Sequence, residues 1–426
     1  MIEPSLSPGT AGGSGGLFGL YSILFAADTV ARGLRFLADV ILFRHFGETI
    51  FGQLNVAQVL TVQGMSISTC GLDTAGTRDV ASGAVPATTM AATVVLLRLV
   101  LGVVAWGIIA GLALVVPQYH DSLLLVALYG LSIFTGASTL GWLAQARGKV
   151  QVVALAIVAT NLAYFTGVEL AATAGWPPAS IPLVLAISEG VAAMALWFWM
   201  LRTVGPVTRP LPLPNALAFL GTSLPIGVAN FLRMLTLGSD VLLLGLFVAE
   251  ADVGQYSVGF KLYSVSLSVL ALYFVILLPH LAREAGRSPA AVKSAVKSAL
   301  GRSLLAAIPL TGAGIFLAGM ILHLLFARES AAATRVLQIL LLALPAALAS
   351  GHFRMALVAL RRQRLDVGLV AAGTAMHIAL KLALIRALGM TGAAWGTLAG
   401  ECALLVLAWL AARRVLRTPA GTPPGS

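Results

Sequence analysis

The chain has 426 residues, of which 59% are hydrophobic and only 10% are charged, and its mean hydropathy is +0.95. Soluble domains carry roughly 25% charged residues, so this composition excludes an ordinary soluble protein and indicates an all-helical protein that crosses a membrane many times. The net charge of +11 raises the question of nucleic acid. Because the Lys and Arg residues lie mostly between apolar segments and form no patch or stripe, we expect no nucleic-acid partner.

Twelve apolar segments approach the length of about 20 residues that a helix needs to cross the hydrocarbon core. They cover residues 20–43, 53–70, 90–116, 122–143, 151–174, 181–201, 216–247, 254–279, 304–326, 334–360, 366–388 and 392–412. The second segment is rich in Gln, Ser and Thr, so it can span a membrane only if it faces protein or water. We therefore predict about twelve transmembrane helices.

The segments fall into two groups of six, which predict two lobes at residues 17–201 and 216–416. The proline-rich residues 202–215 between them are the predicted linker, on the cytoplasmic side. Residues 1–16 are rich in Gly, Ser and Pro and lack the basic start of a signal peptide, so we predict a disordered tail and a first span that is retained. Residues 417–426 are predicted to form a second disordered tail.

A motif in the first half recurs about two hundred residues later. Arg32 is followed seven residues later by Asp39, and Arg233 is followed seven residues later by Asp240. Both copies continue through an apolar run to a Gly-Gln pair, at residues 52–53 and 254–255. Such internal similarity is typical of transporters built from two repeats.

The basic residues outside the segments predict the orientation. With the N-terminus in the cytoplasm, sixteen of them face the cytoplasm: Arg78, Arg147, Lys149, Arg202, Arg209, Arg283, Arg287, Lys293, Lys297, Arg302, Arg361, Arg362, Arg364, Arg413, Arg414 and Arg417. Four face the other side: Arg44, Arg328, Arg335 and Arg386. This asymmetry follows the positive-inside rule, so we expect both termini in the cytoplasm.

The other seven cations lie inside the segments: Arg32, Arg35, Arg98, Arg233, Lys261, Arg354 and Lys381. Each costs about 2.5 to 3.5 kcal/mol at a helix centre, so most must face water or protein. One alternative is pairing within a helix, since Asp28 and Arg32 are four residues apart, as are Arg35 and Asp39. Arg233 has no acidic residue three or four positions away in either direction. Arg98 lies nearer a segment end, where we expect its side chain to snorkel.

Acidic residues inside the segments allow two interpretations. Asp28, Asp39 and Asp240 either carry a coupling proton or sodium ion or neutralise nearby arginines. Glu189 and Glu401 occupy equivalent places in the last segment of each half, which favours a packing role over a substrate site.

The six histidines form no i, i+4 pair and no cluster with acids, so we expect no metal site. The chain also lacks a nucleophile motif and a Walker loop. We therefore expect no cofactor and no catalytic residue, and predict that the protein is not an enzyme.

The two six-segment halves, the run from Asp240 to the Val-Gly-Gln-Tyr-Ser sequence at 253–257, and Lys261 resemble the polysaccharide flippases of the MOP (multidrug, oligosaccharidyl-lipid, polysaccharide) exporter superfamily. The Gly71-Leu72-Asp73 and Thr77-Arg78-Asp79 sequences are similar to the loop after that family's second helix.

The resemblance implies two six-helix lobes that open alternately to the two sides of a bacterial cytoplasmic (inner) membrane. It places Arg32, Arg35, Arg233 and Lys261 on the cavity wall, where arginines suit the phosphates of a polyprenyl-pyrophosphate-linked oligosaccharide. The expected partners are this lipid-linked substrate, membrane lipids, and a polysaccharide polymerase or assembly machinery.

Other functions compete with this interpretation. An ion-coupled multidrug efflux transporter of the MATE type would bind organic cations, which four basic residues would repel. A peptidoglycan-precursor flippase typically has two further helices. A non-transporting scaffold would not need intramembrane charges at repeat-related positions, and a membrane enzyme usually exposes larger loops than this chain has.

Overall fold

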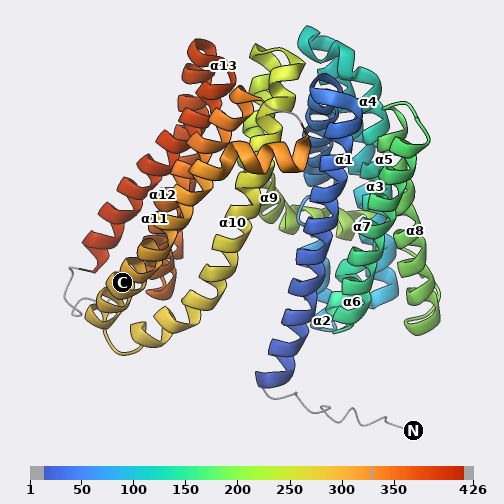
Figure 1. The fold of residues 1–426 in the computed structure, drawn as a ribbon. Helices are drawn as coiled ribbons and strands as arrows, with labels where there is room; N and C mark the ends of the chain where they lie inside the picture. The colour runs from blue at the N-terminus through green and yellow to red at the C-terminus, as the bar shows by residue number, and fades with distance from the viewer. Residues whose placement is uncertain (1–13, 328–329, 417–426) are drawn as a thin grey trace. The chain divides into compact units, whose positions relative to one another are not determined.

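The computed structural model describes residues 14–327 and 330–416, which Figure 1 follows as a ribbon. This part of the chain is all-helical and contains no β-strand, which confirms the predicted fold class. The predicted tails at 1–16 and 417–426 lie outside the described residues, apart from residues 14–16, which begin the first helix.

Thirteen α-helices and one 3-10 helix make up the described part of the chain. They are α1 (Ser14–Thr69), α2 (Leu72–Ala81), α3 (Ala87–Val115), η1 (Pro117–Ser122), α4 (Leu123–Tyr129), α5 (Leu131–Ala137), α6 (Gly141–Ala146), α7 (Val150–Thr173), α8 (Ser180–Thr203), α9 (Leu213–Phe247), α10 (Glu250–Ala285), α11 (Pro289–Phe326), α12 (Ala331–Ala359) and α13 (Gln363–Val415).

The helices α1 and α13 each consist of two limbs joined at a glycine. Gly47 has a φ of 78° and Gly389 a φ of 60°, a left-handed conformation that glycine adopts without steric cost. The limbs correspond to the first and second predicted segments and to the eleventh and twelfth. Residues 44–52, which the sequence left between segments, are therefore helical on both sides of Gly47.

The fourth predicted segment is not one continuous helix. It is divided into η1, α4, α5 and α6, with a break at residues 138–140. Backbone carbonyls near a helix end have no partner inside the helix, so they can accept other donors. The carbonyls of Gly136 and Thr139 do this for an arginine described below.

Nine helical stretches in the described residues are long and apolar enough to cross a membrane, by length and composition. The protein is therefore a multi-pass membrane protein. The total of twelve spans stays a prediction, because no part of α1 is among these nine stretches and the two limbs of α13 count as one of them.

The chain divides into two compact units. The first comprises Met1–His45 and Leu60–Met234, and the second comprises Phe46–Val59 and Leu235–Ser426. Both the second limb of α1 and the helix α9 contribute residues to each unit. The units therefore do not follow the predicted linker at 202–215, and the predicted lobe boundaries stay a prediction.

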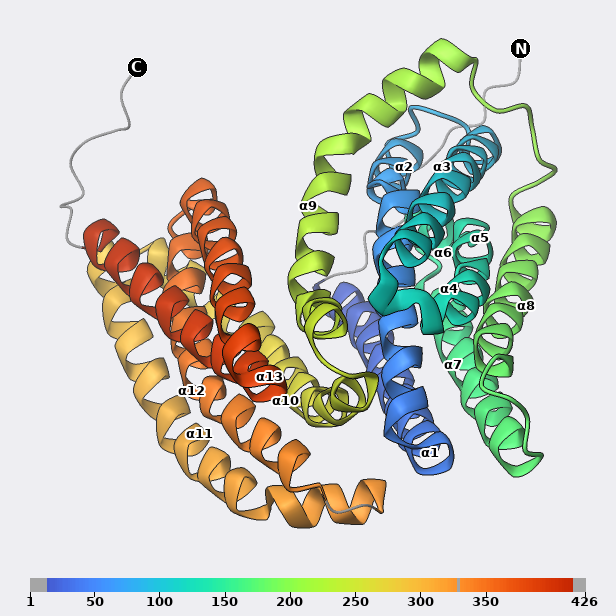
Figure 2. The same cartoon turned by 90° about the horizontal axis from the view of Figure 1, so that it is seen from above.

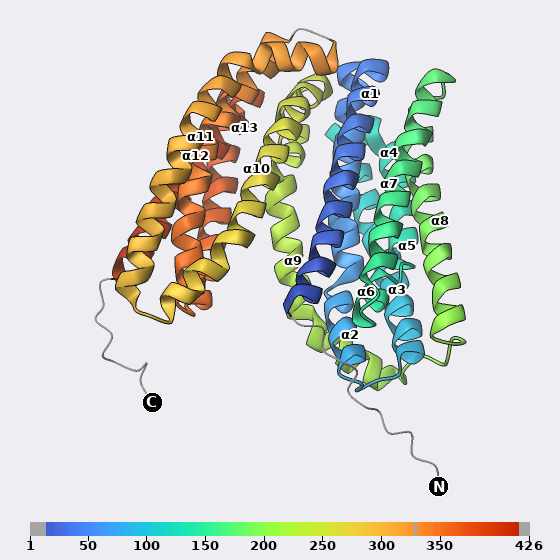
Figure 3. The same ribbon diagram turned by 60° about the horizontal axis from the view of Figure 1, so that its bottom comes forward.

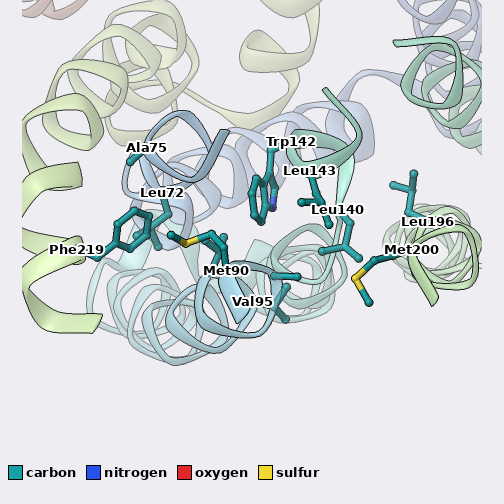
Figure 4. Close-up of a cluster of buried hydrophobic side chains, with 12 residues drawn as sticks. Leu72, Ala75, Met90, Val95, Leu140, Trp142, Leu143, Leu196, Met200 and Phe219 are labelled. Carbon is teal, nitrogen blue, oxygen red and sulfur yellow. The ribbon is translucent and has the colours of Figure 1, made fainter. Parts of the chain in front are cut away.

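In the first unit, a buried apolar cluster joins α2, α3, the residues around α6, α8 and the start of α9. Trp142, Met90 and Met200 are among its largest members, and Phe219 contributes from α9 (Figure 4). The helices α7 and α8 lie side by side in the same unit (Figure 2). This core holds the short, broken helices in place around α3.

In the second unit, α12 is the central helix and packs against α10, α11 and α13 (Figure 3). A buried cluster at one end of these helices consists of Leu277, Leu281, Val292, Val296, Ala299 and Ala356. Close van der Waals packing of this kind is the main force that joins helices inside a membrane.

Candidate functional site

Arg32, on the first limb of α1, forms an ion pair within its own helix. Its Nε donates to Asp28 Oδ2 at 2.7 Å, and the two side chains are 64% and 47% exposed. Pairing within the helix, one of the two interpretations of this arginine, is therefore confirmed. Because the pair is exposed, the guanidinium keeps donors that can reach a ligand.

Arg35 is held by the helix α7. Its Nε donates to Asn161 Oδ1 at 3.3 Å, and its guanidinium carbon lies 5.4 Å from the centre of the Tyr164 ring. Such a cation–π contact fixes the direction of the guanidinium. Asp39, one turn further along α1, is buried in the same unit.

Arg233 lies on α9 and is exposed. Among the described residues it forms no ion pair, in agreement with the absence of an acid at helical spacing. Beside it, Gln63 donates from Nε2 to the carbonyl oxygen of Met234 at 3.0 Å, which ties the second limb of α1 to α9 at this level.

Lys261 lies on α10 in the second unit and is half-buried. Its Nζ lies 5.4 Å from the centre of the Phe51 ring. Arg32, Arg35 and Arg233 belong to the first unit, where no ion pair or hydrogen bond of the described residues links any one of them to another. The assignment of all four cations to one substrate site stays a prediction.

The most deeply buried ion pair of the described residues is one that the sequence did not connect. Asp240 on α9 and Lys381 on α13 form an ion pair, and their side chains are 3% and 4% exposed. The Tyr256 hydroxyl donates to Asp240 Oδ2 at 2.8 Å, and Lys381 Nζ lies 3.4 Å from Ser239 Oγ. The carboxylate of Asp240 is thus neutralised by a cation of the same unit.

Two glycines on the second limb of α13 make room for this group. A Cβ at Gly396 would lie 2.7 Å from Lys381 Cγ, and one at Gly400 would overlap the His377 ring. His377 in turn lies with Nε2 3.8 Å from Glu401 Oε1. His377 and Lys381 are four residues apart, and so are Gly396 and Gly400, which lie opposite them. This matched spacing is the sequence signal that could have revealed the cluster.

Arg98 corrects one prediction. Its side chain does not snorkel but is buried, with NH1 donating to Asp73 Oδ1 at 3.0 Å and NH2 to the Gly136 carbonyl at 2.6 Å. NH1 also lies 3.3 Å from the Thr139 carbonyl. The prediction was wrong because the break after α5 supplies carbonyl acceptors inside the protein, and α2 brings Asp73 to the same place. Arg98 therefore holds three segments of the first unit together.

The repeat-related glutamates have contacts that fit a packing role. Glu189 Oε2 accepts a hydrogen bond of 2.9 Å from Thr135, and Glu401 faces His377. In the part of the chain that the structure describes, no group of three or more His, Cys, Asp or Glu side chains is arranged to hold a metal ion.

Comparison with solved structures defines the class of fold. The chain is similar to an inward-facing multidrug resistance MATE family transporter of the MOP superfamily, at a TM-score of 0.73 and 15% identity, over 92% of this chain and 98% of that one. It is also similar to the lipid II flippase MurJ in an inward closed conformation, at 0.75 and 12%, over 92% and 87%. A MOP superfamily transporter from Pyrococcus furiosus matches at 0.54 and 13%, over 92% and 93%. The fold is thus that of MOP transporters.

The family follows from the sequence. The model of the polysaccharide biosynthesis protein family matches residues 21–285, more than half of the chain. The chain therefore belongs to this family, which confirms the resemblance found in its motifs. No curated protein sequence matches it significantly.

Proposed function

We propose that the protein is a flippase that moves a polyprenyl-pyrophosphate-linked oligosaccharide across the bacterial cytoplasmic membrane by alternating access. The observation that carries this proposal is the set of basic residues retained inside the apolar helices of a polysaccharide biosynthesis family member. The similarity in fold to a lipid II flippase is consistent with a lipid-linked substrate. Intramembrane cations are costly, so a functional role accounts for their presence.

The proposed substrate-binding residues are Arg32, Arg35, Arg233 and Lys261. An arginine fork can hold two phosphate oxygens at once, whereas a lysine offers a point charge. The exposed guanidinium of Arg233 has no carboxylate partner among the described residues, so it can bind a phosphate without first breaking an ion pair. The polyprenyl tail would remain in the bilayer while the polar head group crosses.

Asp28, Asp39 and Asp240 remain the proposed carboxylates for ion coupling. At Asp28 a proton or sodium ion would have to compete with Arg32, and at Asp240 it would have to compete with Lys381. Coupling at either place would therefore release a cation.

Multidrug efflux is the alternative function, because the chain is similar in fold to a MATE transporter. An organic cation would meet four basic side chains at the proposed site, which disfavours its binding. We further propose that both termini are cytoplasmic and that a polysaccharide polymerase or assembly machinery receives the product.

The test is glycan export in cells that lack their own flippase. Arg233→Ala should abolish export at normal protein abundance, and Arg233→Lys should restore only part of it because the bidentate contact is lost. Arg302→Ala is the matched control, since Arg302 is also exposed on a helix but lies at the predicted cytoplasmic end of α11. Full export by Arg233→Ala, or loss of export explained by low abundance, would contradict the assignment.

A further inference from the structure

In the second unit, the first turns of two helical segments cross in close contact, with a glycine of each segment at the crossing point. Gly52 lies on the second limb of α1 and Gly254 on α10, and both are buried. A Cβ at Gly52 would overlap the carbonyl oxygen of Glu250, and one at Gly254 would overlap the carbonyl oxygen of Glu48. The two backbones therefore touch, as they do where small residues let membrane helices approach closely.

Two reciprocal hydrogen bonds flank the crossing. Gln53 Nε2 donates to Glu250 Oε2 at 2.5 Å, and Gln255 Nε2 donates to Glu48 Oε2 at 2.8 Å. The Ser330 hydroxyl donates to Gln255 Oε1 at 2.9 Å, which orients that amide with its nitrogen toward Glu48. Hydrogen bonds to a carboxylate are stronger than neutral ones, so these contacts hold the crossing closed.

The contacts that α1 and α10 make at the crossing are reciprocal. Glu48 follows the kink at Gly47 and Glu250 begins α10, so each glutamate opens a helical stretch. Each glutamine lies five residues after the glutamate of its own helix and bonds the glutamate of the other. The Gly-Gln pair that marks the internal repeat in the sequence is thus a contact between the two copies of that repeat.

We propose that this crossing, the Gly52–Gly254 latch, closes one entrance of the transport pathway and must open in each cycle. The proposal rests on the proposed function. On the predicted topology, residues 44–52 and 248–253 face the outside, so the latch controls exit on that side. Water can replace each of the two Gln–Glu hydrogen bonds, so the latch parts without leaving buried polar groups unpaired.

The latch is linked to a proposed substrate cation. Phe51 precedes Gly52, and its ring lies 5.4 Å from Lys261 Nζ. Lys261 is seven residues beyond Gly254, about two helical turns along α10. An anion that engages Lys261 competes with the Phe51 ring for the ammonium group, and so weakens the hold of α10 on residues 48–59.

A reversible crosslink tests the latch directly. Cys70 and Cys402 are first replaced by serine, and Gln53→Cys is combined with Glu250→Cys, whose native side chains are in hydrogen-bond contact. We expect oxidation in membranes to join the two cysteines, export to fall in proportion to the crosslinked fraction, and reduction to restore it. Failure to crosslink, or undiminished export by the crosslinked protein, would overturn the proposal.

A second crosslink serves as the control. Gly319→Cys with Thr334→Cys joins α11 to α12 inside the same unit, where a Cβ at position 319 would lie 3.7 Å from Thr334 Cγ2. This crosslink should leave export unchanged. Crosslinking is read from gel mobility and needs no substrate, so a latch that forms in a protein whose cysteine-free parent exports no glycan would refute the proposed function and leave the latch standing.

Discussion

Replacing Lys381 with methionine removes one charge from the most deeply buried ion pair of the second unit. The side chains of Lys381 and Asp240 are 4% and 3% exposed, so water cannot take the place of the ammonium group. Methionine keeps most of the length and apolar volume of the lysine stem. The variant therefore tests the charge, with little change in packing against Gly396.

The expected loss is large. Removing one partner of a buried pair costs about 3–5 kcal/mol, because the other charge stays buried without compensation. For a unit of this size, each kcal/mol lowers the melting temperature by about 2–4 °C, which gives a fall of roughly 6–20 °C. The hydrogen bond from Tyr256 to Asp240 remains in the variant and limits the loss of stability.

Thermal unfolding in detergent, followed by tryptophan fluorescence, measures this loss. Adding Asp240→Asn to Lys381→Met removes the stranded charge, so the double variant should recover most of the lost stability. A single variant as stable as the parent protein, or a double variant as unstable as the single one, would refute the reasoning.

Three further predictions concern other parts of the chain. Arg98→Met should lower the melting temperature and the abundance in membranes, measured by fluorescence-detected chromatography, because Asp73 and two carbonyls lose their donor. Gly400→Ala should lower the melting temperature by displacing His377, whereas Gly368→Ala, which meets no atom within 4 Å, should not, and equal effects would argue against the packing interpretation. A cysteine at Arg209 should react with an impermeant maleimide in inverted vesicles only, and labelling in intact cells would reverse the predicted orientation.

The sequence was sufficient to predict the fold class, because the high hydropathy that indicates a helical membrane protein follows directly from the amino-acid composition. It was also sufficient for the pair of Asp28 and Arg32, since a spacing of four residues places two side chains on one helix face. The family, too, followed from local motifs, chiefly the Gly-Gln pairs and the run after Asp240.

The partners of buried cations were beyond such reasoning. Lys381 and Asp240 are far apart in the chain, and their contact depends on how α13 packs against α9. The same holds for Arg98, whose acceptors exist only because the helix breaks after α5. The kinks at Gly47 and Gly389 were also missed, because one glycine in a left-handed conformation replaces a loop and leaves little trace in the hydropathy.

The partners of Arg98 bear on how the protein is made. Among the described stretches, α3 contains the most apolar window, with a mean hydropathy of 2.3, and it is synthesised before Gly136 and Thr139. At 5–20 residues per second, those carbonyls follow Arg98 by roughly 2–8 s. Of the partners described, Asp73 alone precedes α3 in the chain. Asp73 is therefore the partner that has already left the ribosome when Arg98 emerges, whereas the carbonyls of Gly136 and Thr139 emerge after it.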